Sequence, residues 1–157
     1  MPDSPNRTQV GDREVTVTRT FDAPRDVVWR AWTEPEQFAQ WFGGPPYVTQ
    51  PETVSLDVRP GGQWRATMVS EEDGSEIPFA GEYREVVEQE RLVLTFMDPS
   101  DPDNPNVEVL TITFADLGDK TEVVAHQAGH LPQDEYGQLA EGYSTFFDQL
   151  AEHLARR

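Results

Sequence analysis

The C-terminal end of the chain carries an apolar stripe that constrains the fold more than any other feature of the sequence. From Tyr136 to Leu154, aromatic and aliphatic residues recur every three or four positions, which is the spacing of one face of an α-helix. The stripe is wide and rich in aromatic rings, so the helix must bury this face against a large apolar surface. Its members are Tyr136, Leu139, Ala140, Tyr143, Phe146, Phe147, Leu150, Ala151 and Leu154.

The surface that receives this helix is predicted to be a β-sheet. Much of the preceding sequence alternates between apolar and polar residues, which is typical of strands with one buried face. Short turns such as Pro60-Gly61-Gly62 and Asp116-Leu117-Gly118-Asp119 separate these segments and predict antiparallel hairpins. An acidic, proline-rich loop is expected at 98–106. The expected strands are 14–21, 53–59, 63–70, 78–87, 91–97, 107–115 and 121–127.

Two short helices are predicted between the first strand and the others. Pro24 suits the first turn of a helix whose apolar stripe contains Val28, Trp29 and Trp32. Pro35 ends that helix and begins a second one, which the Gly43-Gly44-Pro45-Pro46 run terminates.

This order of elements predicts an α+β fold in which a curved antiparallel sheet wraps the long C-terminal helix. Consecutive strands joined by short turns form a meander, and a sheet of about 6–7 strands must curl. The C-terminal helix is the large apolar element available to fill the concave face. We expect residues 1–12 to form a flexible N-terminal tail and residues 13–157 to form a single domain.

The charge of the chain argues against several classes of partner. The net charge is −17, and such an acidic surface repels nucleic-acid phosphates and anionic lipid headgroups. The chain has no cysteine, which excludes disulfides and thiolate metal sites. Residues 1–11 lack an apolar signal segment, and no stretch has the length of a membrane span. We therefore expect a cytoplasmic protein that contacts neither nucleic acid nor membrane.

Several short motifs resemble one known family in both order and spacing. The order of these motifs resembles that of the START-like, or SRPBCC, superfamily. The resemblance is to the branch that is similar to the C-terminal domain of the activator of the heat-shock-protein-90 ATPase. The resemblance covers nearly all of residues 13–155. The family commonly has tryptophan at the position of Tyr143. The motifs are Phe21-Asp22-Ala23-Pro24, Val28-Trp29-Arg30-Ala31-Trp32-Thr33, Gln40-Trp41-Phe42, Gly61-Gly62-Gln63-Trp64-Arg65, Phe79-Ala80-Gly81-Glu82-Tyr83-Arg84-Glu85-Val86 and Glu141-Gly142-Tyr143.

The resemblance implies the helix-grip fold, in agreement with the order of elements, and it narrows the class of function. Members of the superfamily bind lipids, sterols, polyketides, plant hormones and antibiotics, and some are cyclases or aromatases. The resemblance to the chaperone activator is confined to one of that protein's two domains. The family name therefore does not by itself imply chaperone activation.

A ligand-binding cavity is predicted where the aromatic residues of sheet and helix converge. Aromatic walls with a few polar anchors are typical of small-molecule sites, although the same residues are also suited simply to fill a core. Arg65, His126 and the two tyrosines are the candidates for fixing the orientation of a ligand. The predicted ligand-binding residues are Trp41, Trp64, Arg65, Met68, Phe79, Tyr83, Phe96, His126, Tyr143 and Phe147.

Three functions remain open, and the first is preferred. It is the binding of a small hydrophobic or aromatic molecule, for sequestration, transport or resistance, by a monomer or weak homodimer. The second is a cyclase or aromatase-like enzyme, which requires an ionisable group inside the cavity, with His126 and Glu85 as the main candidates. The third is a chaperone-associated or other protein-interaction module.

Catalytic and metal-binding motifs are weak in this sequence. No nucleophile triad, phosphate loop or nucleotide fingerprint is present, so no catalytic residue and no cofactor is assigned. His126 and His130 are spaced as HxxxH, but a strand end and a loop would not bring them together as a helix would. We therefore expect no metal site. On the strand at 78–87, Glu82 and Arg84 are expected to face solvent, whereas Glu85 shares the parity of Tyr83.

Overall fold

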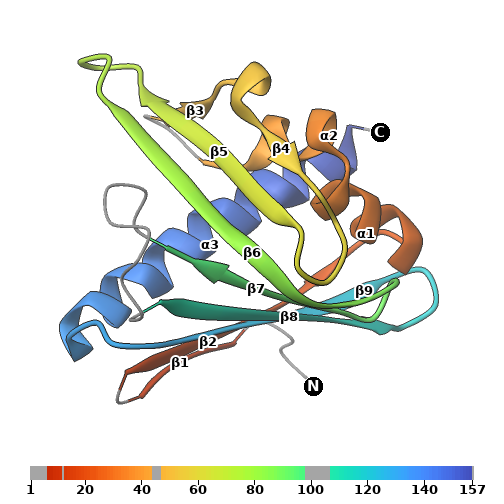
Figure 1. Cartoon of the computed structure of the whole chain (residues 1–157). Helices are drawn as coiled ribbons and strands as arrows, with labels where there is room; N and C mark the ends of the chain where they lie inside the picture. The colour runs from red at the N-terminus through yellow and green to blue at the C-terminus, as the bar shows by residue number, and fades with distance from the viewer. Residues whose placement is uncertain (1–6, 12, 44–46, 98–106, 157) are drawn as a thin grey trace.

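The computed structural model describes residues 7–11, 13–43, 47–97 and 107–156. It contains a nine-stranded antiparallel sheet, and α3 lies across one side of this sheet (Figure 1). The two short helices α1 and α2 lie beside the C-terminal end of α3. The elements in chain order are β1 (Arg7–Gly11), β2 (Glu14–Phe21), α1 (Arg25–Thr33), α2 (Pro35–Trp41), β3 (Tyr47–Thr49), the 3-10 helix η1 (Pro51–Thr53), β4 (Ser55–Leu56), β5 (Gln63–Ser70), β6 (Glu76–Val87), β7 (Arg91–Phe96), β8 (Glu108–Asp116), β9 (Thr121–Ala128) and α3 (Gln133–Ala155).

The α+β helix-grip architecture predicted from the sequence is confirmed. The strands follow the order β1-β2-β9-β8-β7-β6-β5-β3, with β4 also paired to β5. From β5 to β9 each strand pairs with the next one, which is the predicted meander. The chain order breaks at β2, which pairs with β9 along its whole length, from Glu14 opposite Ala128 to Phe21 opposite Thr121. This pairing joins the first part of the chain to the last strand of the meander.

Part of the predicted N-terminal tail belongs to the sheet, which is larger than predicted. Residues 7–11 form β1 rather than a tail, because Arg13 adopts a positive φ of 60° that turns the chain back onto β2. Residues 1–6 of the predicted tail, Asp12 and the predicted loop at 98–106 lie outside the described residues.

The predicted strand at 53–59 is reduced to β4, and β3 was not predicted. Pro51 begins a turn of 3-10 helix, in which the hydroxyl of Thr53 donates a 2.6 Å hydrogen bond to the carbonyl oxygen of Gln50. Only Ser55 and Leu56 then pair with β5. A strand as short as Tyr47–Thr49 carries too few residues to show alternation in the sequence.

The apolar stripe of α3 forms the centre of the core, as its spacing predicted. Tyr136, Phe147 and Leu150 are completely buried. The ring of Phe147 meets Phe21 of β2 edge to face, with 5.6 Å between the ring centroids. None of the helices in the described part of the chain is both long and apolar enough to cross a membrane.

Candidate functional site

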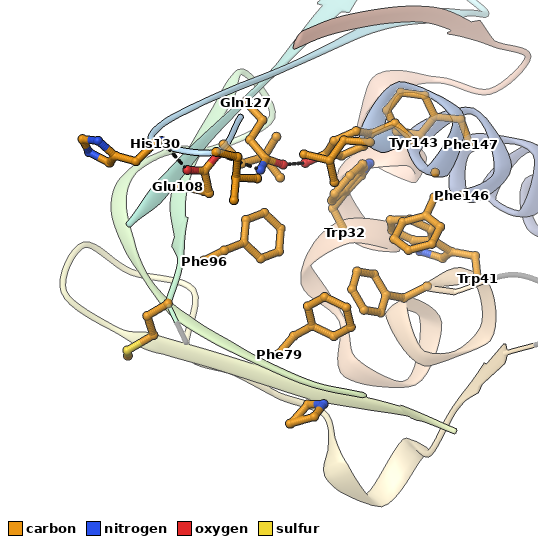
Figure 2. A pocket seen from close by; sticks show the side chains of 17 residues that line it. Trp32, Trp41, Phe79, Phe96, Glu108, Gln127, His130, Tyr143, Phe146 and Phe147 are labelled. Carbon is orange, nitrogen blue, oxygen red and sulfur yellow. Dashed lines mark hydrogen bonds between the residues drawn. The ribbon is translucent and has the colours of Figure 1, made fainter. Parts of the chain in front are cut away.

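A cavity of about 600 Å³ lies between the sheet and α3. Its volume is within the range of ordinary small-molecule sites. Figure 2 shows aromatic side chains from α1, α2, the sheet and α3 directed toward a common space. The described residues that line it are Trp32, Trp41, Phe42, Pro78, Phe79, Phe96, Met97, Glu108, Leu110, Gln127, His130, Leu131, Leu139, Gly142, Tyr143, Phe146 and Phe147.

The aromatic wall is supported by contacts among its own members. Phe42, at the end of α2, lies 5.4 Å from the ring of Phe79 and 5.1 Å from the ring of Phe146, centroid to centroid. The indole N–H of Trp41 donates a 2.8 Å hydrogen bond to the carbonyl oxygen of Ala31. These contacts fix the rings around the cavity without closing it. The rings of the wall therefore support one another.

One end of the cavity is polar, and Glu108 is at its centre. Its Oε1 accepts hydrogen bonds from the hydroxyl of Tyr136 at 2.7 Å and from the side-chain amide of Gln127 at 3.1 Å. Its Oε2 accepts a 2.7 Å hydrogen bond from the backbone N–H of His130. Gln127 Oε1 in turn accepts a hydrogen bond from the hydroxyl of Tyr143 (Figure 2). The network therefore reaches α3 at both Tyr136 and Tyr143.

Both tyrosines in this network act as hydrogen-bond donors at neutral pH. Burial raises the pKa of Tyr143, and the negative charge of Glu108 raises it further. Burial and the hydrogen bond to Glu108 raise the pKa of Tyr136 to about 12, although the nearby positive charge of Arg13 opposes this shift. The phenols therefore keep their protons and donate to Glu108 and Gln127.

Half of the predicted ligand-binding residues line this cavity. They come from α2, β6, β7 and α3, which confirms that the aromatic residues of sheet and helix converge on one space. Whether they contact a ligand stays a prediction. These residues are Trp41, Phe79, Phe96, Tyr143 and Phe147.

Four others on β5 and β6 lie away from it. Trp64 and Tyr83 border a separate space of only about 20 Å³. Met68 is buried against the first glycine after α2, where a Cβ placed on Gly43 would lie 3.2 Å from its sulfur. Arg65 is exposed, because the alternation of β5 directs its neighbours Trp64 and Ala66 inward.

His126 is placed on the opposite side of the sheet from the cavity. Strand β9 alternates strictly, with Val123, Ala125 and Gln127 buried. His126 therefore points outward, where its Nε2 lies 3.0 Å from a carboxylate oxygen of Glu14. The imidazole of His130 is exposed and points away from the cavity (Figure 2). Among the described residues, no three potential metal ligands come together.

The predicted inward candidate Glu85 also lies outside the cavity. A bulge separates the pair Tyr83–Leu94 from the pair Glu85–Val93, so one extra residue on β6 reverses the alternation. Tyr83 is consequently buried, whereas Glu85 is exposed and lies 3.4 Å from Arg91. Glu82 and Arg84 face solvent, as predicted.

The polar residues at this end of the cavity, Glu108 and Gln127, were not predicted, although strand parity contains the signal. Glu108 has the same parity as Leu110, Ile112 and Phe114 on β8, all of which are buried. An acidic residue on the inward face of a strand is unusual. Removing a charge from water costs free energy unless hydrogen bonds or a charged partner compensate. Trp32, Phe42 and Phe146 were also missed, since each appeared only as a member of a helical stripe.

Comparison with protein families identifies the chain. The family described as "Activator of Hsp90 ATPase homolog 1-like protein" matches residues 22–155. The chain belongs to this family. It is therefore a member of the START-like (SRPBCC) superfamily, as the sequence motifs indicated. No match was found among curated proteins.

Solved structures of several bacterial proteins have the same fold. A protein from Chromobacterium violaceum is 26% identical, with a TM-score of 0.75 over 90% of this chain and 96% of its own. One from Nitrosomonas europaea is 26% identical, with a TM-score of 0.78 over 91% and 94% of the two chains. An AHSA1-like protein from Aeromonas hydrophila, 18% identical, has a TM-score of 0.72 over 90% and 92%. These likenesses support the fold.

Proposed function

We propose that this protein binds a small hydrophobic or aromatic molecule in the cavity between the sheet and α3, in order to sequester it, transport it or confer resistance to it. The observation that carries the proposal is the cavity of about 600 Å³ with its aromatic wall. Protein interiors are normally packed as densely as organic crystals, so a hollow of this size forfeits contacts that would stabilise the fold. A ligand restores those contacts.

The chemistry of the wall favours an apolar ligand. Rings from α1, α2, β6, β7 and α3 face the space, and burial of apolar area contributes about 25 cal/mol per Å². The polar groups are confined to one end, around Glu108 and Gln127. This arrangement suits a ligand with an apolar body and one polar group.

Two glycines on α3 provide a matched test of the binding site. Gly142 lines the cavity, and a Cβ placed on it meets no heavy atom within 4 Å. Gly137 is also in α3 with the same free space, but it is not among the lining residues. Leucine at position 142 would project into the cavity, whereas leucine at 137 would leave it open. Leucine has a higher helix propensity than glycine, so each substitution should stabilise α3 by about 0.5–1 kcal/mol. Misfolding therefore does not explain a loss of binding.

The experiment measures binding of the neutral dye Nile red by fluorescence, followed by displacement with sterols, fatty acids and aromatic polyketides. We expect the wild type and Gly137→Leu to bind the dye, and Gly142→Leu to lose most of its affinity. Unchanged binding by Gly142→Leu would place the dye outside the cavity and contradict the proposal. Mass spectrometry of small molecules that co-purify with the wild type identifies a natural ligand.

A cyclase or aromatase-like activity is the second candidate, because an ionisable group does line the cavity. That group is Glu108, rather than His126 or Glu85. A carboxylate beside a bound polyketide is suited to general base catalysis of ring closure. Turnover of linear polyketide substrates that is lost in Glu108→Gln, with substrate binding retained, would support this activity.

A further inference from the structure

The carboxylate of Glu108 lines the cavity without a positively charged partner. The three donors that hold it are a phenol, a side-chain amide and a backbone N–H, and all of them are neutral. Glu108 forms no ion pair within the part of the chain that the structure describes. The described lining residues include neither lysine nor arginine, and the imidazole of His130 points away. The carboxylate is therefore held by neutral donors and forms no ion pair among the described residues, although the positive charge of Arg13 lies near Tyr136.

The hydrogen bonds to Glu108 leave room for one more donor. A carboxylate offers about four acceptor positions, two on each oxygen. Oε1 uses both of its positions, for Tyr136 and Gln127. Among the described residues, Oε2 accepts a hydrogen bond only from the N–H of His130. One position on Oε2 thus remains for a donor that the ligand supplies.

The backbone next to Glu108 fixes the carboxylate in place. A Cβ placed on Gly129 would lie 1.8 Å from Glu108 Oε2 and 2.3 Å from its carboxyl carbon. The absence of a side chain at Gly129 therefore creates the space that the carboxylate occupies. Because the group is already oriented, a ligand does not have to order it on binding, which favours affinity.

We infer that the ligand carries a protonated amine, which forms an ion pair with Glu108 while an apolar or aromatic body fills the rest of the cavity. This inference rests on the proposed function and specifies the class of ligand. The ammonium group supplies the missing donor and the missing positive charge, and such charge-assisted hydrogen bonds are among the strongest in proteins. The aromatic wall favours the same ligand, because ring faces attract cations. The overall charge of −17 also raises the local concentration of cations.

Three naphthalene probes of similar size test this inference by isothermal titration calorimetry. They are 2-(1-naphthyl)ethylamine, 2-(1-naphthyl)ethanol and 1-naphthaleneacetate, which differ mainly in the charge of the polar group. We expect wild-type protein at neutral pH to bind the amine about tenfold or more tightly than the alcohol, and the acid most weakly. Glu108→Gln should reduce the preference for the amine to less than about threefold while the affinity for the alcohol changes little.

Two further variants separate a local effect of Glu108 from other causes. Glu82→Gln removes one charge from the outer face of β6, and it should keep the full preference for the amine if Glu108 acts locally. Gly129→Ala retains the charge of Glu108 but displaces its carboxylate, so it should weaken the preference even if Glu108→Gln does not fold.

The outcomes distinguish this inference from the proposed function. If the alcohol binds as tightly as the amine, or the amine does not bind while the alcohol does, the inference is overturned and the proposed function stands. The same holds if Glu82→Gln abolishes the preference as fully as Glu108→Gln. If neither Nile red nor any naphthalene probe binds the wild type, the proposed function fails, and the inference fails with it.

Discussion

The indole N–H of Trp64 donates a 2.8 Å hydrogen bond to the backbone carbonyl oxygen of Thr95, at a point where β6 has a glycine. A Cβ placed on Gly81 would lie 1.7 Å from that oxygen and 2.6 Å from the indole nitrogen. The backbone N–H of the next residue, Glu82, donates a 3.0 Å hydrogen bond to the side-chain hydroxyl of Thr95. The glycine thus leaves the space in which the indole of Trp64 reaches the carbonyl of Thr95.

Gly81→Ala should destabilise the protein by about 3 kcal/mol, because the new methyl group displaces either the Thr95 carbonyl or the Trp64 indole. Urea denaturation followed by tryptophan fluorescence measures this change. The control is Gly137→Ala, which meets no neighbour and should stabilise α3 by about 0.5–1 kcal/mol. A change at Gly81 that costs less than about 0.5 kcal/mol would show that the contact relaxes freely.

Substitution of Trp64 should affect mainly stability, whereas substitution of Phe146 should affect mainly ligand binding. Trp64→Phe removes the hydrogen bond to Thr95 and should lower the free energy of unfolding by about 1–3 kcal/mol, without a change in Nile red affinity, because Trp64 does not line the cavity. Phe146→Leu removes a ring from the cavity wall and should weaken dye binding more than it affects stability. Weaker binding by the Trp64 variant than by the Phe146 variant would contradict the placement of the site.

Tyr143→Phe should cost about 1–2 kcal/mol of stability, because it removes the donor that Gln127 Oε1 accepts from. A bound probe with a hydroxyl or ammonium group can supply a replacement donor, so naphthylethanol should stabilise the variant at least as much as it stabilises the wild type. Thermal unfolding with and without the probe measures both effects. If the probe stabilises the variant much less than the wild type, Tyr143 itself contacts the ligand.

Stability should fall steeply above pH 10. The pKa values of Tyr83, Tyr136 and Tyr143 are raised in the folded protein, chiefly by burial, and that of Tyr136 reaches about 12. Unfolded tyrosine loses its proton near pH 10, so above that pH the folded state binds more protons than the unfolded state, and stability decreases as pH rises. Each such tyrosine contributes about 1.4 kcal/mol per pH unit, and for Tyr136 the loss continues up to about pH 12.

Urea denaturation between pH 9 and pH 11.5 tests this slope. Tyr136→Phe should show a shallower decline than the wild type, because it has one titrating group fewer. Tyr47→Phe, at a partly buried tyrosine on β3, serves as the control for the loss of a phenol hydroxyl as such. Equal slopes in the wild type and Tyr136→Phe would contradict the role given to burial of this phenol.

The sequence was sufficient for the architecture because local patterns specify it. The stripe from Tyr136 to Leu154 and the turn between β8 and β9 each depend on neighbouring residues, and these predictions were confirmed. The pairing of β2 with β9 was not predicted, because no local pattern reports a contact between distant segments. The position of Glu85 was also missed, since a bulge that shifts β6 by one residue leaves no clear mark in the sequence.

The site was only partly predictable, for a related reason. Aromatic residues such as Phe79 and Phe96 could be assigned to the cavity from parity and the position of α3. His126 was assigned to it because of its chemistry, although the parity of β9 already placed it outside. Glu108 is the reverse case. Its parity on β8 places its side chain on the inner face, whereas its charge is typical of a surface residue. For these two residues parity was more reliable than side-chain chemistry, whereas the bulge in β6 made parity fail for Glu85.

The pairing of β2 with β9 also governs the order in which the chain can fold. Glu14 and His126 lie side by side in the sheet but are 112 positions apart in the sequence. Closing so long a loop carries a large entropic cost, and topologies of this kind fold slowly. The hairpins from β5 to β9 can form first, whereas β2, α1 and α2 must wait for them. Until then the aromatic residues of the two short helices have no sheet to cover them, which makes this stage the one most exposed to aggregation.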